Sequence, residues 1–170
     1  MTQERVNDFV IKIGTVNGTG SASANNLLLK ALFRMGIPVT GKNLFPSNIQ
    51  GLPTWYGIRA NRDGYMSRSL RVDVLVALNN QTYQQDMENL CSGGFLIYDS
   101  TWPRGKQLNR DDITVLGVPL AKMCNENFAD ARVRILMKNI AYVGVLAALM
   151  SIDTGVLQTL IEETFASKPK

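Results

Sequence analysis

The residues best suited to chemistry in this chain are small ones in a glycine-rich turn. The segment Asn17-Gly18-Thr19-Gly20-Ser21 follows an apolar run at residues 9–13 and precedes an amphipathic helical pattern. Backbone N–H groups in such a turn, with the N-terminus of the next helix, can bind an anion or the backbone of a partner. The pattern therefore predicts main-chain contacts to a cofactor at Gly14, Asn17, Gly18, Gly20 and Ser21. The alternative is that the glycines only permit a tight turn and close packing of strand on helix.

A dinucleotide is the first ligand that this turn suggests. Gly18, Gly20 and Ser23 almost reproduce the glycine fingerprint of dinucleotide-binding folds. That fingerprint also needs an acidic residue about 20 positions later for the ribose hydroxyls. The segment Thr40-Gly41-Lys42-Asn43 stands there instead. The sequence therefore does not favour NAD or FAD.

A second candidate region is the loop at residues 45–56, which contains two prolines. Proline restricts the unfolded chain, so such a loop loses less entropy when it becomes ordered. Surface loops of this kind often make contacts, and here Ser47, Asn48 and Gln50 are the polar donors. Arg59, a little further on, could meet a phosphate. The alternatives are an ordinary crossover for the loop and a solvated basic turn for the arginine.

Composition excludes several functions. The chain of 170 residues has no histidine, which removes the usual general base and the commonest metal ligand. Cys91 and Cys124 are too far apart for a zinc or iron–sulfur site, so we expect reduced thiols, no catalytic residue and no metal. A dispersed net charge of +4 argues against nucleic acid. The longest apolar run, 140–150, is too short for a bilayer, and the polar first residues are not a secretory signal, so we expect a cytoplasmic protein without a membrane partner.

The elements that must position these residues alternate between strand and helix. Apolar runs predict strands at residues 9–13, 38–44, 55–61, 72–78, 95–99 and 113–118, of which 55–61 alternates weakly and is typical of an edge. Helical spacing predicts helices at 24–35, from Tyr83 to about Gly93, at 128–150, and after Asp153 as N-cap. Ser21 or Ser23 would cap the first helix and Gly36 would end it. This order predicts an α/β fold: a three-layer, Rossmann-like, mostly parallel sheet with helices on both faces.

The order and spacing of these features resemble one family. The glycine turn, the Pro46-Ser47…Gln50-Gly51 loop, the strand at 72–79 and the Asn139-Ile140-Ala141-Tyr142-Val143-Gly144 helix are similar to the gamma subunit, or gamma domain, of 2-oxoacid:acceptor (ferredoxin) oxidoreductases. The match covers roughly residues 6–165. The family's turn is often Gly-Gly-Gln-Gly and its second loop often carries Arg-Gly-Gly, whereas this chain has Asn-Gly-Thr-Gly and Gln-Gly-Leu. These changes resemble the branch in which the gamma domain is fused ahead of the alpha subunit.

The resemblance implies a role without carbon chemistry. Such enzymes oxidatively decarboxylate a 2-oxoacid, pyruvate or 2-oxoglutarate, with thiamine diphosphate; electrons pass through iron–sulfur clusters to ferredoxin, and coenzyme A takes the acyl group. The gamma domain packs against the alpha and beta subunits or domains, which carry these cofactors, and helps to hold coenzyme A. Residues 1–166 would form this single domain and residues 167–170 a tail or the start of a linker. A stand-alone nucleotide-binding module and a purely structural assembly domain are the alternatives.

Overall fold

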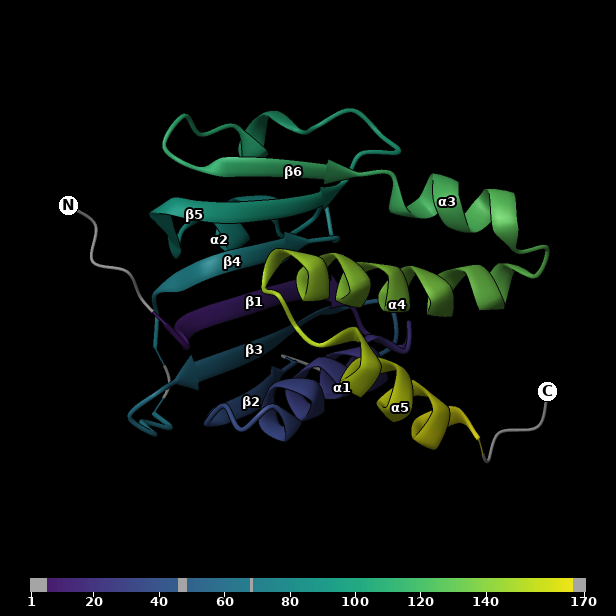
Figure 1. The fold of residues 1–170 in the computed structure, drawn as a ribbon. Helices are drawn as coiled ribbons and strands as arrows, with labels where there is room; N and C mark the ends of the chain where they lie inside the picture. The colour runs from purple at the N-terminus through teal and green to yellow at the C-terminus, as the bar shows by residue number, and fades with distance from the viewer. Residues whose placement is uncertain (1–5, 46–48, 68, 167–170) are drawn as a thin grey trace.

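The fold is built on a six-stranded sheet (Figure 1), in a computed structural model that describes residues 6–45, 49–67 and 69–166. The strand order is β2-β3-β1-β4-β5-β6. β1, β4, β5 and β6 pair in parallel, and β3 runs antiparallel to both of its neighbours, β1 and β2. The strands are β1 Asp8–Val16, β2 Val39–Leu44, β3 Pro53–Asn61, β4 Val72–Ala77, β5 Leu90–Asp99 and β6 Thr114–Val118. The prediction of a mostly parallel α/β sheet is confirmed.

Helices cover the two faces of the sheet unequally. The helices α1 (Ser21–Arg34), α4 (Ala131–Leu149) and α5 (Thr154–Phe165) share one face (Figure 1) and pack on the larger core cluster. Within the described residues, the opposite face carries the short α2 (Tyr83–Met87) and a 3-10 turn, η1 (Lys106–Leu108), over a smaller cluster. α3 (Leu120–Asn127) packs against α4. Helices therefore lie on both faces, as predicted, but the second outer layer is thin.

The first helix forms where its periodicity predicts, and its start differs from the prediction. Its buried residues follow the expected helical stripe: Ala24, Leu27, Leu28, Ala31 and Leu32. Gly36 has a φ of 78°, which confirms it as the left-handed terminal residue. The prediction of a serine cap is wrong, because Gly20 occupies the N-cap position and no side chain caps the helix. The Ser21 hydroxyl is buried and instead accepts a hydrogen bond from Thr15 Oγ1 at 3.0 Å.

Three other predictions need correction. The strand at 55–61 is not an edge strand, because β3 lies between β2 and β1. The helix predicted from Tyr83 to Gly93 ends at Met87, because Leu90 begins β5 and pairs with Val72 of β4. The long helix at 128–150 is α4, which begins after Asp130, whose side chain caps it. α3 was not predicted, since only Leu120 and Cys124 of its eight residues are buried.

The predicted cap of the last helix is confirmed and can be tested. Asp153 accepts hydrogen bonds from the N–H groups of Gly155 at 2.8 Å and Val156 at 3.3 Å. Removing such a cap typically costs about 1 kcal/mol, whereas asparagine keeps an acceptor in place. We expect Asp153→Ala to lower the melting temperature by about 2–4 °C and Asp153→Asn to change it far less. Thermal unfolding followed by circular dichroism measures both, and equal losses in the two variants would contradict the capping role.

Candidate functional site

A concave region beside the predicted turn residues lies where β1 and β4 end. The helix after β1 covers one face of the sheet and the helix after β4 lies on the other, so the chain diverges between these two neighbouring strands. Ligands of doubly wound folds bind at such a switch point, outside the carboxyl ends of the strands. A cavity of about 670 Å³ opens there. We call it the carboxyl-edge crevice; its lining includes Val16, Gly51, Leu78, Asn79, Asn80, Gln81, Tyr83, Tyr98, Asp99, Trp102 and Lys138.

The glycine turn stands beside this crevice and requires glycine at two positions. Gly18 and Gly20 have φ values of 87° and 80°, in the left-handed region that side chains disfavour. A Cβ on Gly18 would lie 2.6 Å from Gln50 Cγ, and a Cβ on Gly20 would lie 2.6 Å from Leu136 Cδ2. Both glycines therefore serve the backbone path and close packing, whatever else the turn binds.

Hydrogen bonds hold the glycine turn against the second loop. The backbone N–H of Asn17 donates to the Leu52 carbonyl at 2.8 Å, and the N–H of Gly51 donates to the Asn17 carbonyl at 3.0 Å. From α4, Asn139 Nδ2 donates to the Thr19 carbonyl at 2.7 Å. These bonds fix the turn largely through its carbonyl groups.

The backbone N–H groups at the end of the same turn, unlike its carbonyl groups, are open to a ligand. Among the described residues, the backbone N–H groups of residues 20–22 have no acceptor within hydrogen-bond range. Gly18 and Ala22 are exposed, and α1 has no side-chain cap. A helix start with open N–H groups carries a partial positive charge. This arrangement is suited to an anion.

Comparison with known proteins gives the family. The model of the family described as pyruvate ferredoxin/flavodoxin oxidoreductase matches residues 10–170. The chain belongs to this family. The resemblance inferred from the turn, the second loop and the late helix is thereby confirmed.

The relatives of this family member differ greatly in length. The alpha subunit of 2-oxoacid:ferredoxin oxidoreductase 2 from Aeropyrum pernix is 30% identical over 121 residues, 71% of this chain and 18% of that protein. A chain of the 2-oxoglutarate:ferredoxin oxidoreductase from Magnetococcus marinus, solved with 2-oxoglutarate, coenzyme A and succinyl-CoA bound, matches with a TM-score of 0.84 at 21% identity; the match covers 98% of this chain and 28% of that one.

Two solved subunits match over most of their own length. A pyruvate oxidoreductase subunit from Thermotoga maritima has a TM-score of 0.72 at 18% identity, covering 94% of this chain and 86% of that one. The gamma subunit of a keto/oxoacid ferredoxin oxidoreductase from Geobacter sulfurreducens has a TM-score of 0.70 at 16% identity, covering 95% and 87%. The fold is thus that of a separate subunit in some relatives, while this chain spans under a fifth of the Aeropyrum protein.

Only some of the residues predicted to contact a cofactor lie close together in the structure. Asn17, Gly18, Gly20 and Gln50 lie together at the turn, and Ser21 lies buried at the start of α1. Ser47 and Asn48 lie outside the described residues. The remaining two predicted residues, Gly14 and Arg59, have other surroundings.

Gly14 and Arg59 do not join the turn. Gly14 is buried inside β1, and a Cβ there would lie 2.7 Å from Asp86 Oδ2, so the glycine makes room for that carboxylate. Arg59 is in the middle of β3, opposite Val10, and donates to the carbonyl and the hydroxyl of Ser67. Arg59 belongs to a groove on the sheet face, separate from the carboxyl-edge crevice.

Several polar residues of the site were not predicted. Asn79 is buried directly after β4; its Nδ2 donates to the Thr15 carbonyl at 3.4 Å, and its Oδ1 accepts from the Gln81 N–H at 3.1 Å. Its place after a buried apolar run was a usable signal, because the carboxyl ends of parallel strands meet at one edge. Lys138 offered no such signal, since only the packing of α4 brings it to the crevice.

Two titratable side chains of the crevice, Tyr83 and Asp99, have environments that the structure explains. Burial, together with the negative charges of Asp99 and Asp86, raises the pKa of Tyr83, so its phenol stays protonated near neutral pH. The carboxylate of Asp99 accepts hydrogen bonds from Thr101 and from the Ala121 N–H at the start of α3. The protonated phenol of Tyr83 can therefore donate a hydrogen bond to a ligand in the crevice.

Two findings concern the rest of the chain. Among the residues that the structure describes, no three side chains of histidine, cysteine, aspartate or glutamate are grouped to hold a metal ion. In the same residues, no helix has the length and apolar character needed to span a bilayer.

Proposed function

We propose that this chain is the gamma domain of a 2-oxoacid:ferredoxin oxidoreductase and holds coenzyme A in the carboxyl-edge crevice. The family match and the gamma-subunit fold support the assignment. The fold neighbour from Magnetococcus marinus was solved with coenzyme A bound, and its substrate, like the pyruvate named for the family, is a 2-oxoacid. The reaction proposed for the complete enzyme is the coenzyme A-dependent oxidative decarboxylation of such an acid, with electrons passed to ferredoxin.

The observation that carries this proposal is the pairing of an open helix start with a cation and aromatic rings. Coenzyme A presents phosphate groups and an adenine. The N–H groups of residues 20–22 and the ammonium of Lys138 are suited to the phosphates. Tyr83, Tyr98 and Trp102 line the same cavity and offer faces on which a base can stack. The cavity volume of about 670 Å³ falls in the range of small-molecule sites.

The carbon chemistry belongs, in this proposal, to the rest of the enzyme. The sequence has two cysteines, fewer than the four that an iron–sulfur cluster requires, and the described residues do not fit a metal-anchored diphosphate. We therefore assign thiamine diphosphate and the clusters to alpha and beta subunits or domains, which are this chain's partners, and place the enzyme in the cytoplasm. We propose that residues 1–166 form this one domain.

Lys138 provides a direct test. We expect Lys138→Gln to raise the KM for coenzyme A about tenfold in the assembled enzyme, because one charge-assisted contact contributes about 1.5 kcal/mol, and to leave kcat unchanged. Steady-state kinetics with varied coenzyme A measures both constants. The matched control is Lys122→Gln on the exposed surface of α3, which should alter neither.

Two results would overturn the proposal. An unchanged KM for coenzyme A in the Lys138 variant would show that coenzyme A does not bind in the crevice. Equilibrium dialysis that showed tight binding of NAD, FAD or ATP but none of coenzyme A would favour a nucleotide-binding module instead.

A further inference from the structure

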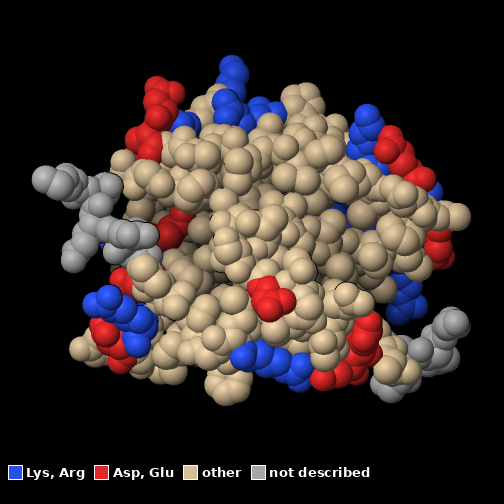
Figure 2. Space-filling model, viewed as in Figure 1, with Lys and Arg blue, Asp and Glu red and all other residues tan. Residues whose placement is uncertain are grey.

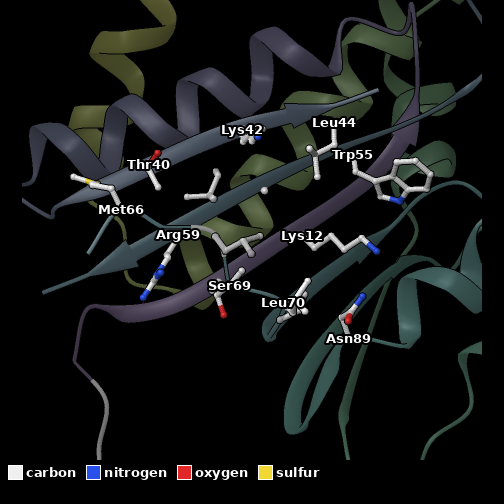
Figure 3. A pocket seen from close by; sticks show the side chains of 15 residues that line it. Lys12, Thr40, Lys42, Leu44, Trp55, Arg59, Met66, Ser69, Leu70 and Asn89 are labelled. Carbon is white, nitrogen blue, oxygen red and sulfur yellow. The ribbon is translucent and has the colours of Figure 1, made fainter. Parts of the chain in front are cut away.

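Half of the sheet lacks a covering helix on one face. β2, β3 and β1 have α1 beneath them, while α2 on the other side reaches only one corner, where Asp86 meets Lys12 and Trp55. Over the remainder of that face the described residues form no covering layer, and a groove of about 260 Å³ opens (Figure 3). Parallel sheets normally bury both faces, whereas antiparallel pairs such as β1/β3 and β2/β3 can leave one face in water. What this three-strand face binds therefore has to be argued from its side chains.

The strand register arranges the side chains of this face in rows. Lys12, Gly57 and Lys42 are directly paired across β1, β3 and β2, so two lysines flank a glycine. On β3 the neighbours of Gly57 on the same face are Trp55 and Arg59, because side chains alternate along a strand. A Cβ on Gly57 would meet only the Lys42 carbonyl, at 4.0 Å, so the centre of the face is an open notch.

The charge of the groove is positive. The residues that line the groove include Lys12, Lys42 and Arg59. No aspartate or glutamate is among the residues that line it. Lys12 is compensated by Asp86, at 3.1 Å. Arg59 donates to uncharged oxygens of Ser67, and Lys42 makes no ion pair within the described residues. Within the described residues, Lys42 and Arg59 therefore have no carboxylate partner. Covering these two cations with an apolar or basic surface would be unfavourable.

The shape of the groove favours a helix over a small molecule. Leu70 and Met66, which are 71% and 54% exposed, line the groove on either side of Arg59 and Ser69, and Trp55 and Leu44 lie together at the end opposite Met66 (Figure 3). Three neighbouring strands span about 10 Å, close to the diameter of one helix. The volume of about 260 Å³ is below that of most small-molecule sites. The opposite, helical face has a largely uncharged centre, with one acidic residue in its lower middle and both signs of charge nearer its edge (Figure 2), so the basic groove is not part of a general charge pattern.

We propose that the face of β2, β3 and β1 is the docking surface for an acidic amphipathic helix from the polypeptide that carries the rest of the enzyme. A carboxylate of that helix lies over Gly57, between Lys12 and Lys42, and its apolar side chains contact Leu70 and Trp55. The helix completes the missing layer of the sheet. This inference rests on the proposed function, since it takes the partner to be the catalytic part of the same oxidoreductase.

Zero-length cross-linking of the assembled enzyme tests the contact. A carbodiimide joins an amine to a carboxylate only when the two are in direct contact, and mass spectrometry identifies the joined peptides. We expect Lys42 or Lys12 to be linked to an acidic residue of the partner polypeptide. Lys42 should also be at least tenfold less reactive toward acetylation than Lys30, which is exposed on α1. Links to a second copy of this chain, or a fully reactive Lys42, would overturn the proposal.

Two variants test the same contact through assembly. Gly57→Ile fills the notch: a Cβ there meets only the Lys42 carbonyl at 4.0 Å, and isoleucine favours strands, so we expect the fold to persist while docking is lost. Lys42→Glu reverses one charge of the groove. We expect each to weaken assembly at least tenfold, with Lys30→Glu as a charge-matched control that does not, and thermal unfolding shows that each variant folds.

The two proposals fail in distinguishable ways. Failure of the wild-type chain to join an active 2-oxoacid oxidoreductase contradicts the proposed function. An active wild-type complex that tolerates both Gly57→Ile and Lys42→Glu contradicts the docking surface alone.

Discussion

Replacing Asp86 by alanine is expected to destabilise the fold by about 3–5 kcal/mol, because it breaks a buried ion pair. Asp86 is fully buried. Its carboxylate accepts hydrogen bonds from Trp55 Nε1 at 2.6 Å and Thr82 Oγ1 at 2.8 Å, and pairs with Lys12 Nζ at 3.1 Å. Alanine would leave two donors and an ammonium without their acceptor. Since whole domains are stable by about 5–15 kcal/mol, this is a large fraction of the total.

Urea denaturation followed by tryptophan fluorescence measures the effect, because Trp55 is itself a partner of Asp86. The matched control is Asp111→Ala, which removes an exposed carboxylate and should change stability by less than about 0.5 kcal/mol. A loss of under 1 kcal/mol in the Asp86 variant would show that water replaces the carboxylate, contrary to its burial.

The Asp86 cluster illustrates what a single sequence does not reveal. Its members are far apart in the chain: Lys12 is in β1, Trp55 in β3 and Asp86 in a helix of five residues. Nothing in the spacing of these residues joins them. The sequence predicts Gly14 as a ligand contact. In the structure, its lack of a side chain makes room for the Asp86 carboxylate. A glycine in a strand indicates a close approach, and only the tertiary fold identifies the approaching group.

The sheet was predictable because its signal is local. β4 is almost continuously apolar, as strands buried on both faces are, and its bounds were predicted to within one residue. The helix predicted from Tyr83 to about Gly93 is too long because it, too, was predicted from local spacing alone. Tyr83, Met87 and Leu90 have helical spacing, but Leu90 is buried because it pairs in β5. Short periodic runs satisfy helix and strand alike, and long-range pairing decides between them.

The candidate site was predictable only where one segment makes it. The glycine turn is contiguous, so its left-handed glycines and its place before α1 follow from the sequence. Lys138, Trp102 and Asn79 come from three different segments and meet only at the edge of the folded sheet. Arg59 is the converse case. Its chemistry suits a phosphate, but alternation along β3 turns it onto the open face of the sheet, away from the turn.

The second large effect is expected at the glycine turn itself. Gly20→Val places a β-branched residue at a φ of 80°, which costs about 2–3 kcal/mol, and its Cβ would lie 2.6 Å from Leu136 Cδ2 of α4. The same helix carries Lys138 and Asn139, so displacing it disturbs the cation of the crevice and the bond to Thr19 together. We expect the KM for coenzyme A in the assembled enzyme to rise more than tenfold.

Gly144→Ala is the matched control for that variant. Gly144 is exposed in α4, and a Cβ there would meet nothing within 4 Å, so alanine should stabilise the helix by about 0.5–1 kcal/mol and leave coenzyme A kinetics unchanged. Stability and KM must be measured on the same preparations, at a temperature where both variants are folded. If the folded Gly20→Val enzyme keeps the wild-type KM, the glycines only shape the backbone, and the glycine turn does not bind the phosphates of coenzyme A.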